Sequence, residues 1–246
     1  MKGEPRNYRN LIHSDRLVVF HVVVKETDLL ISASSALETV AREHILTCRH
    51  HIENYIAHYP EFLKTLHPWR VLGPAPAIVR KMADAGEHAG VGPMAAVAGA
   101  IAEYVGKELL AYSDEVIVEN GGDTFFKTHE PVTAGIYAGK SPLSLKVGLR
   151  VASDSCPVSL CTSSGTIGHS LSFGKADAVC VMSASCALAD AVATAVGNRV
   201  QTPRDIQSAI EFGKNIPGVT GLVVILGKDM GLWGDLELIP LQGKNC

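Results

Sequence analysis

The stretch CTSSGTIGHSLSFGKADAVCVMSASCALADAVATAVGN, residues 161–198, lies at the centre of the predicted fold and of the predicted chemistry. Its first nine residues are rich in glycine and small hydroxyl side chains, which favours a backbone loop that wraps a ligand. The β-branched apolar run 178–182 predicts a strand. The small residues 186–196 predict a helix that carries one carboxylate, Asp190, and one hydroxyl, Thr194.

Composition restricts the class of partner. A chain of 246 residues with 47% hydrophobic residues can bury a substantial core, either as one large domain or as two fused small ones. With 22 basic and 25 acidic residues it has no broad basic field, so we expect a small-molecule ligand and neither nucleic acid nor a membrane as partner. The six cysteines form no CxxC pair and the N-terminus has no apolar signal core, which favours a cytoplasmic location.

Outward from the central stretch, strands and helices come in blocks. Residues 16–25 and 29–33 predict a hairpin, and residues 36–59 predict a long amphipathic helix with Ser34 or Ser35 as its N-cap. Further strands are expected at 115–119, 134–137, 145–151, 178–182, 221–227 and 236–239, and further helices at 78–85, 94–105, 186–196 and 203–214.

The order of these blocks predicts the fold class. Residues 16–127 and 145–240 each run strand, strand, helix, helix, strand, strand. This order indicates an α+β fold made of two similar units with antiparallel sheets. Because no linker separates the units by composition, we expect a single domain of two pseudo-repeats, at about residues 16–138 and 145–240.

Asp190 and Thr194 are the strongest candidates for metal ligands. They are four residues apart and therefore share one helix face. A carboxylate and a hydroxyl, completed by a backbone carbonyl, water and a ligand phosphate, suit Mg²⁺. The alternative is a buried aspartate that bonds to a backbone loop, with a threonine that bonds back to its own helix. A second set, His44, Cys48 and His51, is better explained by the apolar stripe of the long helix.

Two loops are candidates for contact with the ligand. Residues 162–169 offer backbone N–H groups and hydroxyls to a phosphate, and His169 could supply a general acid or base. The residues Asn120, Gly121, Gly122 and Asp123 favour a hairpin turn, and a loop that presents N–H groups and Asp123 to a polar ligand is the alternative. A further hypothesis makes Cys161 a nucleophile with His169 as its base, but the residues around Cys161 match no nucleophile-elbow pattern, which favours a packed thiol.

Three separated motifs resemble the ApbE superfamily. These are ENGGD (119–123), TSSG (162–165) and ADAVATA (189–195), and the match runs from about residue 90 to residue 198. The resemblance implies a T-fold-like α+β architecture and an enzyme that binds FAD with Mg²⁺ and transfers FMN to a threonine hydroxyl of an acceptor protein. An oligomeric state is not implied, so a homo-oligomer stays open.

The resemblance also implies roles for individual residues. Asp190 and Thr194 would hold the metal, with a backbone carbonyl near Val91 and Gly92 as a third ligand. The nucleotide would lie beside both loops, and the catalytic candidate is His169. The residues expected to bind the nucleotide are Asn120, Gly121, Gly122, Asp123, Thr162, Ser163, Ser164, Gly165 and Thr166.

The sequence departs from the family pattern at two places. His169 leads into SLSFGKADA, without the Asp-Pro and Thr-Gly of the family, and residues 93–99 (PMAAVAG) lack the charged residues found there in the transferases. A protein that holds a flavin or another small ligand without transferring it is therefore the alternative to an enzyme.

Overall fold

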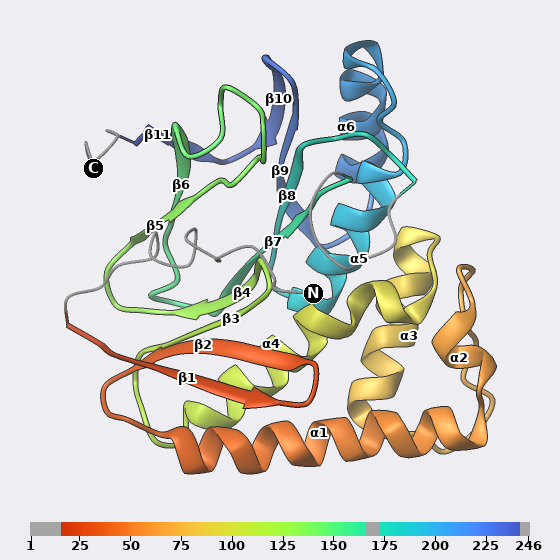
Figure 1. The fold of residues 1–246 in the computed structure, drawn as a ribbon, viewed down its shortest axis with the longest axis vertical. Coiled ribbons are helices and arrows are strands. Elements are labelled where there is room, and N and C mark those ends of the chain that lie inside the picture. The colour runs from red at the N-terminus through yellow and green to blue at the C-terminus, as the bar shows by residue number, and fades with distance from the viewer. Residues whose placement is uncertain (1–15, 166–172, 242–246) are drawn as a thin grey trace.

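The structure is a computed structural model that describes residues 16–165 and 173–241. Within these ranges the chain forms an eight-stranded antiparallel sheet in the order β1-β2-β3-β4-β7-β8-β9-β10 and a three-stranded sheet in the order β11-β6-β5 (Figure 1). The strands are β1 (Val18–Val24), β2 (Thr27–Ala33), β3 (Val116–Asn120), β4 (Asp123–Lys127), β5 (Val132–Gly135), β6 (Val147–Val151), β7 (Val158–Ser163), β8 (Ala178–Ser183), β9 (Val219–Leu226), β10 (Asp229–Gly234) and β11 (Glu237–Pro240). The helices are α1 (Glu38–His58), α2 (Glu61–Lys64), α3 (Ala77–Ala89), η2 (Pro93–Ala96), α4 (Val97–Leu109), α5 (Cys186–Gly197), η3 (Pro203–Asp205) and α6 (Ile206–Lys214).

The element order confirms the predicted α+β class with paired ββααββ units. In the first unit, β1 and β2 are followed by helices α1 to α4 and then by β3 and β4. In the second unit, β7 and β8 are followed by α5 and α6 and then by β9 and β10. Since β4 pairs with β7, one continuous antiparallel sheet joins the two units.

The strands of the second unit differ from those expected. The predicted strands 145–151 and 236–239 correspond to β6 and β11, which pair with each other in the small sheet. The first strand of the unit is β7, and its residues 161–163 had been expected to belong to a ligand-binding loop. That expectation was wrong because β7 is a central strand between β4 and β8, where neighbouring strands satisfy the backbone of its small polar residues.

The large sheet separates two hydrophobic cores. On its helical face α1, α4, α5 and α6 pack against the strands, while α2 and α3 pack on other helices. The small sheet covers the middle of the other face (Figure 1). Helix α5 lies at the centre of the helical side, in contact with α3, α4, β7 and β8. A helix enclosed in this way can approach its neighbours only if its side chains are small, which explains the alanine-rich sequence of α5.

Helix α1 packs against the β1–β2 hairpin. Its buried residues recur at spacings of three and four, as the sequence predicted, and are Ala41, Ile45, Cys48, Ile52 and Tyr55. The predicted cap was wrong, because the N-cap residue is Leu37 and makes no side-chain cap bond. The Ser34 hydroxyl instead lies 2.9 Å from the hydroxyl of Ser113, which ties the end of β2 to the segment before β3.

Among the described helices, no single one is long and apolar enough to cross a membrane. The helices 77–89 and 93–109 pass the length and composition test only as a pair, and they are bent by 105° relative to each other.

Candidate functional site

A cavity of about 420 Å³ opens beside α5. Its lining comes from three parts of the chain that are far apart in sequence: the segment after α1, the loop and helix start around η2, and the second half of α5 with Phe173. The lining residues are Leu63, Lys64, Thr65, Leu66, Val91, Gly92, Met94, Ala95, Val97, Ala98, Phe173, Asp190, Thr194 and Asn198. The cavity therefore joins the two predicted metal ligands to the loop that was expected to supply a backbone carbonyl.

One face of α5 supplies the polar part of this lining. Asp190, Thr194 and Asn198 follow one another at intervals of four residues and therefore lie on one side of the helix. Each is partly accessible, whereas most of their neighbours in α5 are buried. Asp190 and Thr194, whose spacing of four was noted in the sequence, thus line a cavity and are not part of the protein core.

Asp190 also binds the backbone of α4. Its Oδ2 accepts a hydrogen bond of 2.9 Å from the backbone N–H of Gly99, one of the first N–H groups of that helix. The carbonyl oxygen on the other side of the same peptide group, that of Ala98, accepts a hydrogen bond of 3.0 Å from Nδ2 of Asn120. One peptide group therefore connects Asp190 to the turn at 120–123.

The approach of α4 to α5 depends on Gly99. A Cβ at this position would lie 2.3 Å from the carbonyl oxygen of Cys186 and 2.9 Å from Cβ of Asp190. The close neighbour of this glycine is thus a second helix. Because any larger residue would push α5 away, Gly99 fixes the distance between Asp190 and the start of α4.

The turn at 120–123 is a two-residue hairpin connection. Asn120 pairs with Asp123, and Gly121 and Gly122 have φ angles of 68° and 115°, which glycine adopts without strain. Oε1 of Glu119 accepts a hydrogen bond of 2.9 Å from the N–H of Gly122. The hairpin interpretation of the sequence is therefore confirmed, and Asp123 is buried at the start of β4.

The buried Asp123 and the partly accessible Asp190 are neighbouring acids that influence each other's ionisation. Burial raises the pKa of Asp123 well above its usual value, and the nearby charges of Asp190 and Glu119 raise it further. Burial likewise raises the pKa of Asp190 to about 7, although backbone hydrogen bonds from Gly99 and Ala98 oppose the change. A cation bound beside two such acids would stabilise their ionised forms and lower both pKa values.

Cys161 lies behind this pair and is fully buried. Its Sγ is 3.3 Å from the carbonyl oxygen of Cys186 and 3.5 Å from Sγ of Cys186. Burial, the neighbouring thiol and the charges of Asp123 and Asp190 raise the pKa of Cys161 well above its usual value. A protonated and enclosed thiol is a poor nucleophile, so the geometry favours the packed-thiol interpretation of Cys161.

Glu103 is a buried charged residue that sequence reasoning missed. Its carboxylate accepts hydrogen bonds from the N–H of Cys186 at 2.9 Å, from Lys107 at 2.6 Å and from Lys81. Burial alone would raise the pKa of Glu103, but the two ammonium groups outweigh it and hold the pKa below its usual value. Glu103 therefore stabilises the N-terminus of α5, the helix that carries Asp190. The available signal was a single acid in the apolar run 94–105, four residues before a lysine.

The remaining predicted ligand-binding residues lie away from the cavity or outside the described residues. Thr162 and Ser163 end β7, and the hydroxyl of Thr162 bonds to Sγ of Cys180. Ser164 and Gly165 follow this strand, and the N–H of Gly165 donates to the carbonyl of Ala176 at 2.9 Å. None of these four is among the described residues that line the cavity. Thr166 and His169 belong to residues 166–172, which lie outside the described part of the chain.

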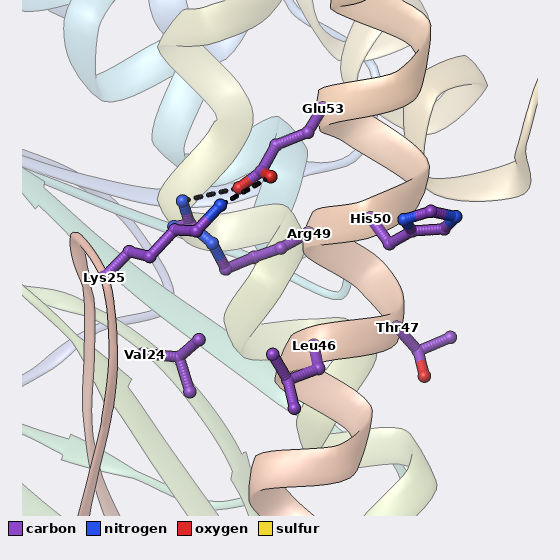
Figure 2. A pocket seen from close by; sticks show the side chains of 7 residues that line it. All are labelled: Val24, Lys25, Leu46, Thr47, Arg49, His50 and Glu53. Carbon is purple, nitrogen blue, oxygen red and sulfur yellow. Dashed lines mark hydrogen bonds and ion pairs between the residues drawn. The ribbon is translucent and has the colours of Figure 1, made fainter.

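A second cavity, of about 490 Å³, lies between the β1–β2 turn and α1 (Figure 2). Figure 2 shows Lys25 and Arg49 directed toward Glu53. The carboxylate of Glu53 lies 2.7 Å from Nζ of Lys25 and 2.8 Å from a guanidinium nitrogen of Arg49. The same nitrogen of Arg49 lies 2.6 Å from the carboxylate of Glu26. Because its cations are already neutralised by acids of the protein, this cavity is a weaker candidate for an anionic ligand. The part of the chain that the structure describes contains no cluster of three or more His, Cys, Asp or Glu suited to a metal ion.

Comparison with known proteins shows relatives along most of the chain. Residues 9–234 match a protein-family model described as AbpE bacteria. The UPF0280 protein of Methanococcus aeolicus is 45% identical over 202 residues, which cover 80% of this chain and 82% of that protein. The UPF0280 protein of Methanocella arvoryzae is 41% identical over 217 residues, which cover 88% of each.

Solved structures share the fold at low sequence identity. The apo form of the flavinyl transferase ApbE of Pseudomonas stutzeri superposes with a TM-score of 0.59 at 13% identity, covering 88% of this chain and 94% of that one. The flavin transferase ApbE from Vibrio cholerae gives a TM-score of 0.55 at 10% identity, covering 88% and 96%. At such identities the likeness concerns the fold alone.

Proposed function

This chain belongs to the family described as AbpE bacteria, and from that membership we propose that its α5 cavity binds a flavin nucleotide together with Mg²⁺. The resemblance to the ApbE superfamily, predicted from three short motifs, is confirmed by the family match and by the shared fold. Solved proteins of this fold are flavin transferases by name, which supports a flavin nucleotide as the ligand. The volume of about 420 Å³ is within the range of small-molecule sites.

The observation that carries the proposal is the convergence of hard oxygen donors on one cavity. Asp190 with its carboxylate, Thr194 with its hydroxyl, and the residues Val91 and Gly92 all line it. Oxygen donors of this kind suit Mg²⁺, and the raised pKa of Asp190 indicates a carboxylate whose negative charge lacks compensation from the protein. Asp190 and Thr194 would hold the ion, which would neutralise the charge of the ligand phosphates.

The side chains divide the work of binding between them. Gly99 and Ala98 orient the Asp190 carboxylate through their backbone, and Asn120 holds that backbone in place. Lys64, also in the lining, contributes a positive charge toward a phosphate. In a transferase the cavity would also admit an acceptor hydroxyl from a second protein, in line with the predicted FMN transfer.

The lining itself supports a second candidate, a protein that retains the nucleotide without cleaving it. Among the described lining residues, Asp190 and Lys64 are the two with ionisable side chains, and both are assigned to binding. Residues 93–99 add no charge at the start of α4, as the sequence indicated. General acid–base catalysis from this part of the lining would thus have to use a group that already binds the ligand.

Calorimetric titration with FAD, FMN and ADP, each with and without Mg²⁺, tests the binding proposal, and mass spectrometry of the FAD mixture separates the two candidates. Metal-dependent binding with release of AMP supports transfer or pyrophosphate cleavage. Metal-dependent binding with FAD recovered intact after long incubation supports the retaining protein. Absence of metal-dependent binding for all three nucleotides would contradict both.

A further inference from the structure

An aromatic side chain stands exposed at the cavity. Phe173 is 57% exposed, although a phenylalanine in a monomeric protein gains free energy from burial. Its backbone is nevertheless held at both polar groups. The N–H donates to Oδ1 of Asn198 at 2.8 Å, and the carbonyl accepts from Nε2 of Gln201 at 2.7 Å. The protein therefore fixes the backbone of this residue and leaves its ring uncovered.

The anchor of Phe173 belongs to the polar face of α5. Asn198 lies four residues after Thr194 and eight after Asp190, and all three line the cavity. Helix α5 and its C-cap residue Asn198 thus fix the position of the Phe173 backbone relative to the proposed phosphate-binding groups. A ligand that places its phosphates at Asp190 and Thr194 would pass along this face toward the ring.

A second apolar surface borders the same space. Leu63 and Leu66 are 49% and 51% exposed and contribute to the lining from the segment after α1. This segment packs closely on the loop before η2, because a Cβ at Gly92 would lie 2.0 Å from the carbonyl oxygen of Thr65. The apolar wall and the loop expected to contribute a carbonyl are consequently fixed to each other.

From these contacts we infer that Phe173 binds the heteroaromatic ring of the bound nucleotide by stacking on it. The inference deepens the proposed function and rests on it for the placement of the phosphates. Stacking on an aromatic side chain tolerates different rings, so adenine and flavin are both compatible with this chemistry. A backbone already ordered before binding lowers the entropic cost of the contact.

The test compares three ligands: pyrophosphate, which has no ring, ADP, which joins adenine to two phosphates, and FMN, which joins flavin to one phosphate. Each is titrated calorimetrically, with and without Mg²⁺, into the full-length wild type, Phe173→Ala and Phe173→Tyr. Tyr112→Ala is the matched control, because Tyr112 is also an aromatic residue with 57% exposure and lies outside the described cavity lining. For ligands that bind, proton NMR of the ligand ring reports stacking through upfield shifts.

We expect Phe173→Ala to weaken the preferred ring-bearing ligand roughly tenfold or more, to abolish its upfield shifts and to leave pyrophosphate unchanged. Phe173→Tyr should restore affinity, and Tyr112→Ala should have no effect. The ligand that loses affinity, ADP or FMN, identifies the ring. Equal weakening of all three ligands, or of none, overturns the inference.

The same titrations separate this inference from the proposed function. Wild-type protein that binds pyrophosphate with Mg²⁺, but ring-bearing ligands no more tightly, contradicts the role of Phe173 alone. Binding of a ring-bearing ligand that depends on Phe173 and not on Mg²⁺ contradicts the metal proposal and supports the ring contact. No binding of any probe contradicts both.

Discussion

The carboxylate of Asp190 and the backbone N–H of Gly99 are joined by a hydrogen bond of 2.9 Å across 91 residues of sequence. This bond places an acid of the second ββααββ unit at the N-terminus of a helix of the first. The favourable interaction of a carboxylate with a helix N-terminus offsets part of the cost of burying it. The rest of the negative charge on Asp190 is left for a cation in the cavity to neutralise.

Asp190→Asn keeps an oxygen acceptor for Gly99 and removes the charge beside Asp123. We expect Mg²⁺-dependent nucleotide affinity to fall by roughly 100-fold or more. In EDTA at pH 8 the free energy of unfolding should rise on the order of 1–3 kcal/mol, because a carboxylate whose pKa is raised to about 7 is held ionised in the fold at a cost. Calorimetry measures the nucleotide affinity, and urea denaturation measures the free energy of unfolding.

Asp177→Asn is the control, because Asp177 is an acid that accepts a hydrogen bond from the N–H of Gly227, and this variant should leave nucleotide affinity unchanged. Lower stability of Asp190→Asn would contradict the electrostatic argument.

Gly99→Ala inserts a Cβ between α4 and α5. The new carbon would meet the carbonyl oxygen of Cys186 at 2.3 Å, so the helices must separate. We expect a loss of about 1–3 kcal/mol in the free energy of unfolding and weaker nucleotide binding, because Asp190 moves with α5. Gly73→Ala has nothing within 4 Å of the new Cβ and serves as the control. Equal effects of the two substitutions would show that the close helix contact is unimportant.

Glu103→Gln tests the buried carboxylate at the start of α5. At pH 7 we expect the variant to lose about 1–2 kcal/mol, since the buried carboxylate loses its ionic bonds to Lys81 and Lys107, whose partly exposed ammonium groups water can solvate. The folded-state pKa of Glu103 is lowered, so its contribution is fully present above the ordinary value near 4.5 and is lost as the pH falls through the folded-state pKa. Denaturation curves from pH 3 to pH 7 should therefore show wild type and variant converging on the acid side. A stability gap that does not change with pH would refute the ionic contribution.

Cys161→Ala separates the packed thiol from the hypothetical nucleophile. We expect nucleotide binding, and any turnover of FAD, to persist, with a loss of about 1–2 kcal/mol in stability from the buried side chain. Cys156→Ala, at an exposed cysteine, should change neither property. A folded Cys161→Ala variant that had lost all turnover would restore the thiol hypothesis.

Local patterns predicted the elements that depend on local chemistry. The spacing of Ala41, Ile45 and Cys48 predicted α1, and Asn120-Gly121-Gly122 predicted a hairpin turn, because both signals need few distant contacts. The strand β7 was not predicted because Cys161, Thr162 and Ser163 break the alternation of apolar and polar positions that Val158 to Leu160 begin. Its secondary structure depends on pairing with β4 and β8, which the local sequence does not reveal.

The site divides in the same way. The interval between Asp190 and Thr194 was readable because it lies within one helix. The pairing of Asp123 with Asp190, the role of Glu103 and the exposure of Phe173 each depend on contacts between elements far apart in sequence. No local pattern encodes such contacts, so the polar face of the cavity was predictable and its apolar wall was not.

The cavity is lined by residues 63–66, residues 91–98 and one face of α5, which are segments far apart in the chain. Such high contact order makes the site a late product of folding, because the loops between these segments must close before their contacts contribute. In a nascent chain that still lacks α5 the cavity cannot form. A ligand of this cavity would therefore recognise only chains that have completed their topology, and by mass action it would protect these molecules from unfolding.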